Sequence, residues 1–127
     1  MTDAYLRSRH NNTAALRRAI RNGWIKVDVE NGRVLKSNGK PFCIVRNGAG
    51  YERFLLRRGK ERRYYVHKAV FIASGKPYRH DMHIDHINDN NADNRGENLQ
   101  MLTPAQNSQK MQARTKERLA QHFPVPF

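Results

Sequence analysis

The sequence predicts an α+β fold, in which a small basic antiparallel β region is followed by a strand–strand–helix unit. Two observations carry this prediction. Residues 24–66 hold short runs of alternating apolar and polar residues that are separated by Asn-Gly and Gly turns. Residues 82–119 hold two more strand candidates, a long polar loop between them and a strong helix start directly after them. The length of 127 residues suits one domain with a core of modest size.

The first half of the chain is expected to begin with a helix and to continue as hairpins. Residues 13–22 are rich in Ala and Arg, which are good helix formers, and Gly23 suits the end of a helix. Asn31-Gly32 is a hairpin turn signal between two alternating runs. The strands expected in this antiparallel meander are residues 25–29, 33–35, 42–46, 51–57 and 62–66.

The second half is expected to form a short helix, two strands and a longer helix. The short helix is predicted over residues 67–73, because Ser74-Gly75 suits its end. Thr103 is a candidate N-cap, Pro104 occupies the first helical position and Gln106 completes a capping box. We therefore expect strands at residues 82–87 and 99–102, a polar loop at 88–98 and a helix at 104–119.

The composition is strongly basic, with 24 Lys and Arg residues, 11 Asp and Glu residues and a formal net charge of +13. Such an excess repels itself in a compact protein, so we expect a polyanionic partner, nucleic acid before an anionic membrane surface. Residues 1–66 hold 16 of the basic residues. One basic run there is interpreted as a phosphate-contacting surface, with a merely solvated hairpin tip as the alternative. Its members are Arg57, Arg58, Lys60, Arg62 and Arg63.

Several classes of protein are disfavoured by the same composition. No apolar run approaches the roughly 18 residues that a membrane span requires, and no signal peptide follows Met1. Cys43 is the single cysteine, which argues against a disulfide framework and against a structural zinc site. A cytoplasmic protein without a membrane partner is therefore expected.

The residues that suggest chemistry lie in and after an acidic, Asn-rich segment at residues 81–98. Phosphodiester hydrolysis needs a hard cation to stabilise charge on the phosphate and a base to deprotonate water. Asp85 and the amide oxygen of Asn107 are hard ligands, which suit one Mg²⁺ ion, or alternatively Mn²⁺, that keeps most of its waters. His86 is the natural base, and an amide oxygen such as that of Asn98 would fix its tautomer.

The order of these residues resembles the HNH endonucleases, also called the ββα-metal family, and in particular their phage- and intron-encoded group. The resemblance rests on Asp85-His86 at a strand end, Asn98-Leu99 at the next strand, and Asn107 after Thr-Pro at the helix start. It covers residues 62–108, including a Val-His-x-x-Val stretch upstream of the site. The loop departs from the family pattern at Asn88-Asp89, where the family has Asp-Gly, and at Asp93, where it has Asn.

This resemblance implies a divalent-metal-dependent endonuclease that acts on double-stranded DNA. Asp85 and Asn107 would be the metal ligands, His86 the general base and Asn98 the residue that orients it. Residues 1–61 would be a basic DNA-holding part, 62–119 the nuclease module and 120–127 a tail. A phage or mobile-element origin is implied by the resemblance alone.

One set of site residues predicts one metal and a nick in one DNA strand, with a monomer favoured over a homodimer. Two alternatives remain open: a catalytically silent DNA-binding protein that keeps the motif as a scaffold, and a basic RNA-binding or ribosome-associated protein. A calcium loop is disfavoured, because the spacing of Asp89, Asn91 and Asp93 lacks the Gly and Glu that an EF-hand requires. Asn94 and Arg95 are interpreted as loop-stabilising residues.

Overall fold

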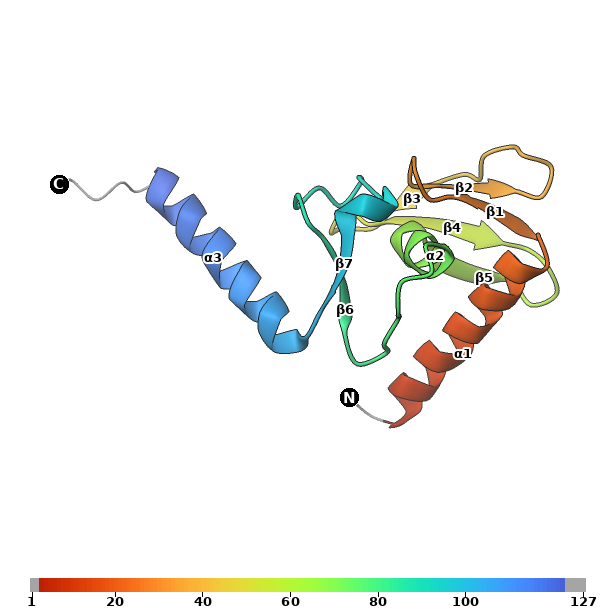
Figure 1. The fold of residues 1–127 in the computed structure, drawn as a ribbon, viewed down its shortest axis with the longest axis horizontal. Coiled ribbons are helices and arrows are strands. Elements are labelled where there is room, and N and C mark those ends of the chain that lie inside the picture. Colours follow the sequence, from red (N-terminus) through yellow and green to blue (C-terminus); the bar gives the residue numbers. More distant parts are fainter. Residues whose placement is uncertain (1–2, 123–127) are drawn as a thin grey trace.

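The computed structural model describes residues 3–122, and it describes the side chains of residues 12–121. Within this part, three α-helices and seven strands form (Figure 1), and their mixture confirms the predicted α+β class. In chain order, the elements are α1 (Asp3–Arg21), β1 (Ile25–Asp28), β2 (Arg33–Lys36), β3 (Val45–Arg46), β4 (Glu52–Leu56), β5 (Arg62–Tyr65), α2 (Val66–Ala73), β6 (His83–His86), the short 3-10 helix η1 (Gly96–Asn98), β7 (Leu99–Leu102) and α3 (Pro104–His122).

The strands form three small antiparallel sheets. β1 pairs with β2, β4 lies between β3 and β5, and β6 pairs with β7. The predicted meander is therefore two sheets, because the segment after β2 makes an isolated bridge through Pro41, which has no N–H to extend a ladder. The boundary expected between residues 61 and 62 falls between the paired strands β4 and β5.

α2 is the centre of the hydrophobic core. Its Val66, Ala69 and Val70 are buried, and the helix contacts α1, strands of both N-terminal sheets and the β6–β7 hairpin. Leu16 of α1 and Leu99 of β7 belong to the same core cluster. Each fully buried Val or Leu side chain contributes about 1.5–3 kcal/mol. The N-terminal sheets and the β6–β7 hairpin are thus joined by one core.

α1 begins at Asp3, ten residues before the predicted start. The extension includes residues with weak helix propensity, and local propensity therefore did not predict it. At its junction with the core, Thr13 is 3% exposed and Asn12 accepts a hydrogen bond from Lys68 Nζ at 3.1 Å. None of the described helices combines the length and apolar character that a membrane crossing needs.

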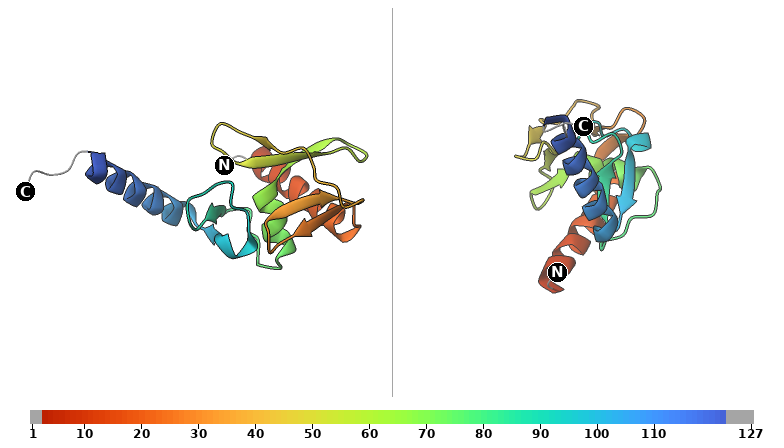
Figure 2. Two further views of the ribbon diagram at one scale, coloured as in Figure 1. Left: turned by 90° about the horizontal axis from the view of Figure 1, so that it is seen from above. Right: turned by 90° about the vertical axis from the view of Figure 1, so that its left-hand side faces the viewer.

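α3 projects from the body of the protein, as Figures 1 and 2 show. Its predicted capping box is present, since Gln106 N donates to Thr103 Oγ1 at 3.1 Å and Thr103 N donates to Gln106 Oε1 at 2.9 Å. Along its described side chains, only Asn107 and Lys110 are partly buried. The helix continues through residues 120–122, which were expected in a tail, and residues 123–127 lie outside the described part.

Candidate active site

The predicted site residues gather around the end of β6. Asp85 pairs with Gln100 and His86 pairs with Leu99 across the β6–β7 hairpin. Neighbouring side chains on a strand point to opposite faces. Asp85 accordingly contacts α3, whereas His86 lies among the rings of the N-terminal part. Both side chains are buried, at 8% and 3% exposure, because the last two residues of β6 are enclosed on both faces.

The Lys110 ammonium group lies against the Asp85 carboxylate. Asp85 Oδ2 accepts hydrogen bonds from Lys110 Nζ at 2.6 Å and from Gln100 Nε2 at 2.8 Å. The same ammonium lies 3.0 Å from Asp89 Oδ1 and donates to the backbone oxygen of His86 at 3.0 Å. Burial opposes the charge of Lys110, but its bonds to Asp85 and Asp89 outweigh that effect and raise the pKa of the ammonium.

This oxygen-rich position fits a single hard cation. Asn107 lies one turn before Lys110 in α3 and is partly buried like it, so the two residues share one helix face. No group of three His, Cys, Asp or Glu side chains converges as a metal cluster within the described part of the chain. One carboxylate and one amide oxygen, completed by water, would form a donor set that suits Mg²⁺. A metal at Asp85 Oδ2 requires Lys110 Nζ to withdraw from that oxygen.

The partner of the His86 ring is Asn94, not the predicted Asn98. His86 Nε2 lies 2.8 Å from Asn94 Oδ1, and Asn94 Nδ2 donates to Glu52 Oε1 of β4 at 2.9 Å. Asn98 closes the loop: its Oδ1 accepts from the backbone N of Asn88 at 3.0 Å. Its Nδ2 donates to Asn88 Oδ1 at 2.9 Å and to the backbone oxygen of residue 93 at 2.8 Å. The Asn98 amide is therefore engaged by the loop and does not orient the imidazole.

The loop is held from outside by the β1–β2 hairpin. Gly96 N donates to the backbone oxygen of Val29 at 2.8 Å. A Cβ on Gly32 would lie 2.3 Å from the carbonyl carbon of Asn94, and a Cβ on Gly96 would lie 2.5 Å from a methyl of Val29. Lys76 Nζ donates to the backbone oxygen of Gly96 at 2.8 Å. The segment that carries Asn94 is thus locked into the N-terminal part.

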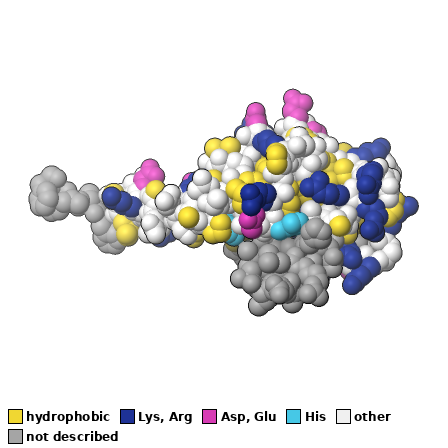
Figure 3. Space-filling model, turned by 60° about the horizontal axis from the view of Figure 1, so that its bottom comes forward, with side chains coloured by type: hydrophobic (Ala, Val, Ile, Leu, Met, Phe, Trp, Pro, Cys, Tyr) yellow, Lys and Arg dark blue, Asp and Glu magenta, His cyan; other side chains and the backbone are white. Residues whose placement is uncertain are grey.

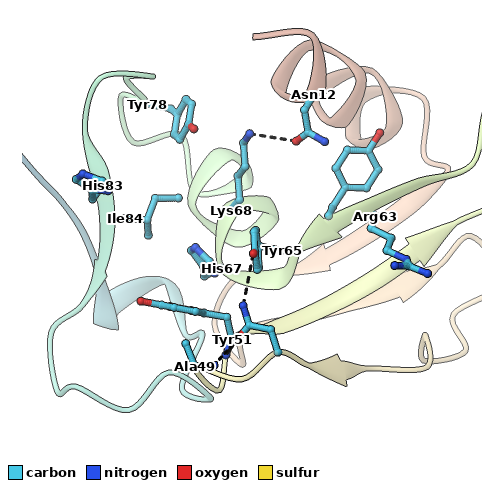
Figure 4. A pocket seen from close by; sticks show the side chains of 12 residues that line it. Asn12, Ala49, Tyr51, Arg63, Tyr65, His67, Lys68, Tyr78, His83 and Ile84 are labelled. Atoms are coloured by element: carbon cyan, nitrogen blue, oxygen red, sulfur yellow. Dashed lines mark hydrogen bonds between the residues drawn. The ribbon is translucent and has the colours of Figure 1, made fainter. Parts of the chain in front are cut away.

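A cleft of about 490 Å³ lies beside His86. Two rings that line the cleft also contact the imidazole: Tyr51, with ring centroids 5.8 Å apart, and His67, at 5.4 Å. Figure 4 shows these rings with Tyr65 and the basic side chains of Lys68 and Arg63 around the same cleft. The cleft combines aromatic faces with positive charge, which suits a segment of nucleic acid.

His67 carries no charge near neutral pH. Its Nδ1 is enclosed and has no hydrogen-bond partner among the described residues. Burial lowers the pKa of His67 to about 3, and the neighbouring His86 acts in the same direction. His67 therefore acts as a neutral ring that packs against His86.

The predicted basic run lies on and around the β4–β5 hairpin. Its tip is exposed, and the Arg58 guanidinium lies 4.5 Å from the ring centroid of Trp24. Arg63 lines the cleft beside His86. Arg57 directly follows the end of β4, and the five residues from Glu52 to Arg57 span roughly 17 Å when extended, which separates Arg57 from the start of the strand near the site. Figure 3 shows Lys and Arg side chains gathered at the end of the body away from α3. The structure thus brings one member of the run to the cleft and leaves the tip apart from it.

Besides Asn94, which was expected only to stabilise the loop, the site residues that the sequence did not predict include Lys110, Gln100 and Glu52. Lys110 follows Asn107 by three residues in a predicted helix, so helical periodicity could have placed it on the same face. Gln100 lies opposite Asp85 in the predicted hairpin, which is a weaker signal. Glu52 lies 42 residues from Asn94 in sequence, and no local pattern links the two.

Residues 64–109 match the family model of the HNH endonucleases. In overall fold, the chain is similar to a solved structure described as "DNA binding and cleavage by the HNH homing endonuclease I-HmuI", with a TM-score of 0.65 and 25% sequence identity. The match covers 78% of this chain and 61% of that one, so this chain spans less than two thirds of the length of its relative. Among curated proteins, none matches the sequence significantly.

Proposed function

We propose that this chain, whose residues 64–109 match the HNH endonuclease family model, is a divalent-metal-dependent endonuclease that acts on double-stranded DNA. One observation carries the proposal: the buried Asp85 carboxylate lies in an oxygen-rich, cation-holding position directly beside a buried His86. That pair supplies a place for a hard cation and a base for water within one strand end. The structural relative is described as binding and cleaving DNA, which supports the choice of substrate.

In this proposal, Asp85 and the amide oxygen of Asn107 hold one Mg²⁺ or Mn²⁺ ion. The ion supplies charge stabilisation at the scissile phosphate and at the leaving oxygen. His86, in its neutral form, accepts a proton from the water that attacks phosphorus, and the P–O bond to the leaving oxygen breaks. Arg63 and Lys68 of the cleft hold the phosphate backbone beside the base.

We further propose that the enzyme nicks one strand and belongs to a phage or mobile genetic element. One Asp-His…Asn set attacks one phosphate per engagement, so a double-strand break would need a second site in register. The structural relative is described as a homing endonuclease, which supports the mobile-element assignment. A monomer in the cytoplasm of a host cell is the expected form.

The test is cleavage of supercoiled plasmid at low enzyme concentration with Mg²⁺, with and without EDTA. We expect open-circle DNA to appear first, linear DNA much later and no product with EDTA. Linear DNA formed without an open-circle intermediate would overturn the nicking proposal. Tight plasmid binding with no cleavage under Mg²⁺ or Mn²⁺ would favour the catalytically silent DNA-binding alternative.

Asp85→Ala and Asn107→Ala are expected to abolish cleavage and to lower Mn²⁺ affinity in calorimetry, because each removes a hard ligand from a site with few of them. Plasmid binding should persist, since the basic surface is unchanged. Asp81→Ala is the matched control, because this exposed carboxylate pairs with Arg79 at 2.8 Å outside the site. Unaltered metal affinity in both site variants would remove these residues from the ligand set.

A further inference from the structure

The hydrogen bonds of Asn94 run in one direction from β4 to His86. A side-chain amide has one oxygen that accepts and one NH₂ group that donates. Glu52 Oε1 lies 2.9 Å from Asn94 Nδ2, and an ionised carboxylate can only accept. The opposite end of the amide, Oδ1, therefore faces His86 Nε2 at 2.8 Å. Because Oδ1 can only accept, Nε2 must carry the hydrogen.

We propose that Glu52 is a positioning residue of the active site, which acts through Asn94 to hold His86 as the Nε2–H tautomer. In that tautomer, Nδ1 keeps its lone pair and is the atom that accepts the proton from water. The catalytic part of this inference rests on the proposed function, whereas the tautomer itself does not. Glu52 lies outside residues 64–109, so the proposal gives the N-terminal sheet a share in the chemistry.

The surroundings of Asn94 make the orientation of its amide specific. Asn94 is 2% exposed, and its backbone is locked between Gly32 and the bond from Gly96 to Val29. In such a place water cannot replace a lost hydrogen bond, and a reversed amide would set its NH₂ group against a donor and its oxygen against a carboxylate. Each buried mismatch of this kind leaves a polar group without a partner, which strongly disfavours the reversed amide.

Glu52 is itself held in position. It is a strand residue of β4, paired in register with Arg46 of β3. Its second oxygen, Oε2, lies 3.4 Å from an Arg46 guanidinium nitrogen, and its side chain is 18% exposed. Because Oε2 of Glu52 contacts Arg46, Oε1 remains to accept the hydrogen bond from Asn94. The turn between β3 and β4 holds the loop at a second point, because Asn91 Nδ2 donates to the backbone oxygen of Ala49 at 2.8 Å.

Without the acceptor at position 52, the Asn94 amide is free to rotate by half a turn. Its NH₂ group would then face His86 Nε2, which would have to accept, and the hydrogen would move to Nδ1. A protonated Nδ1 on a neutral ring cannot act as the base. Loss of an outer residue that orients a site histidine typically costs about 10–100-fold in activity.

The experiment reads the tautomer directly, from the ¹⁵N chemical shifts of the His86 ring in the folded chain without DNA. We expect the Nε2–H tautomer in the unmodified protein and a mixture, or Nδ1–H, in Glu52→Met, whose side chain has similar length but no acceptor. Glu52→Gln should retain Nε2–H, because its amide oxygen can accept the same bond. Glu30→Met, on an exposed turn, is the matched control and should leave the spectrum of His86 unchanged.

Two further measurements complete the test. In Glu52→Met/Asn94→Asp, the carboxylate accepts through either oxygen, so Nε2–H should return although position 52 offers nothing. In plasmid cleavage, Glu52→Met should lose about 10–100-fold in kcat with little change in KM, and Glu52→Gln should recover most of it. Circular dichroism checks folding, and Glu52→Ser replaces Glu52→Met if the latter does not fold.

The outcomes separate this inference from the proposed function. An Nδ1–H tautomer in the unmodified protein, or an unchanged tautomer in Glu52→Met, overturns the inference whatever the activity is. A tautomer that follows position 52 as expected supports it, even if no variant cleaves DNA. In that last case the positioning network stands and the nuclease proposal fails.

Discussion

Asp85 and His86 are adjacent in sequence, but their side chains contact different parts of the protein. Asp85 faces α3 and the Lys110 ammonium, and His86 faces Tyr51 and His67. The alternation of a strand separates the two tasks without separating the backbone. In the proposed mechanism, Asp85 would hold the metal and His86 would act as the base from the same strand end, and neither side chain would compete for the position of the other.

His86→Ala is expected to lower the single-turnover cleavage rate by about 10²–10⁴-fold, the usual scale for loss of a general base. DNA affinity should change little, because His86 is 3% exposed and offers almost no surface to DNA. Rates at saturating enzyme, together with a binding isotherm, check both statements. A loss of less than about threefold in rate would assign the base to another group.

Asn98→Ala should act mainly on stability, since its amide makes three hydrogen bonds within the loop. At about 0.5–1.5 kcal/mol for each bond, the free energy of unfolding should fall by about 1.5–4.5 kcal/mol. Denaturant unfolding measures this change. The His86 tautomer should remain Nε2–H in this variant, and a switch to Nδ1–H would restore Asn98 as the residue that orients the ring.

The choice between Asn94 and Asn98 shows where prediction from sequence stops. Motif spacing located Asp85, His86 and the loop between the strands, because these follow directly from the order of residues. Which amide reaches the ring depends on the path of the loop. Asp89 takes a positive φ of 64° at the position where the family pattern has Gly, a conformation that Asp tolerates better than most residues. Such a turn redirects the chain in a way that spacing does not reveal.

At the scale of elements, the β1–β2 hairpin is the part whose role was least visible in the sequence. Asn31-Gly32 predicted its turn, and the hairpin forms as expected between Asp28 and Arg33. The docking of that turn against the site loop is a long-range packing event, which no local pattern encodes. α3 is the opposite case, since its capping box and its start were readable from Thr103, Pro104 and Gln106.

Gly32→Ala is expected to destabilise the protein by about 2–5 kcal/mol. The positive φ of 67° costs about 1–2 kcal/mol for a residue with a Cβ, and the new atom would lie 2.3 Å from the backbone of Asn94, which adds about 1–3 kcal/mol of overpacking. Gly39→Ala is the matched control: its φ is 84°, but no atom lies within 4 Å of the new Cβ. Equal losses in the two variants, measured by urea unfolding, would show that the hairpin does not press on the site loop.

For the molecule as a whole, stability is expected to fall as the solution is acidified below pH 6.5. The pKa of His67 is lowered to about 3 in the folded protein. As pH falls below 6.5, the unfolded chain therefore binds a proton at His67 before the folded protein does, and this shifts the equilibrium toward the unfolded state. The slope contributed is at most about 1.4 kcal/mol per pH unit between 6.5 and 3. The contact with Arg95 lowers the pKa of Asp93 to about 2 in the folded protein. The stability that this carboxylate contributes is therefore lost only as pH falls below its ordinary pKa of 3.8.

His67→Phe should weaken the pH dependence of the melting temperature between pH 4 and 6, because the phenyl ring cannot be protonated. Asp93→Asn is the comparison, and its effect should be confined to lower pH. A pH dependence that is unchanged in His67→Phe would assign the acid sensitivity to other groups.

The charge of +13 is the property of the whole molecule that most directly concerns DNA. Binding that neutralises phosphates releases counterions, so log K should fall linearly with log salt, by about 0.9 per phosphate contact.

We expect a combined change of Arg57, Arg58, Arg62 and Arg63 to Gln to flatten that slope, because the exposed β4–β5 tip and the cleft-lining Arg63 present these charges to DNA. An equal loss of charge in the β1–β2 region is the control, made by changing Lys26, Arg33, Lys36 and Lys40 to Gln. If both fourfold variants flatten the slope equally, net charge alone governs binding and the β4–β5 hairpin is merely solvated. A larger change in the arginine variant would instead locate the phosphate contacts on the hairpin and extend the DNA path from the cleft beside His86 along β4.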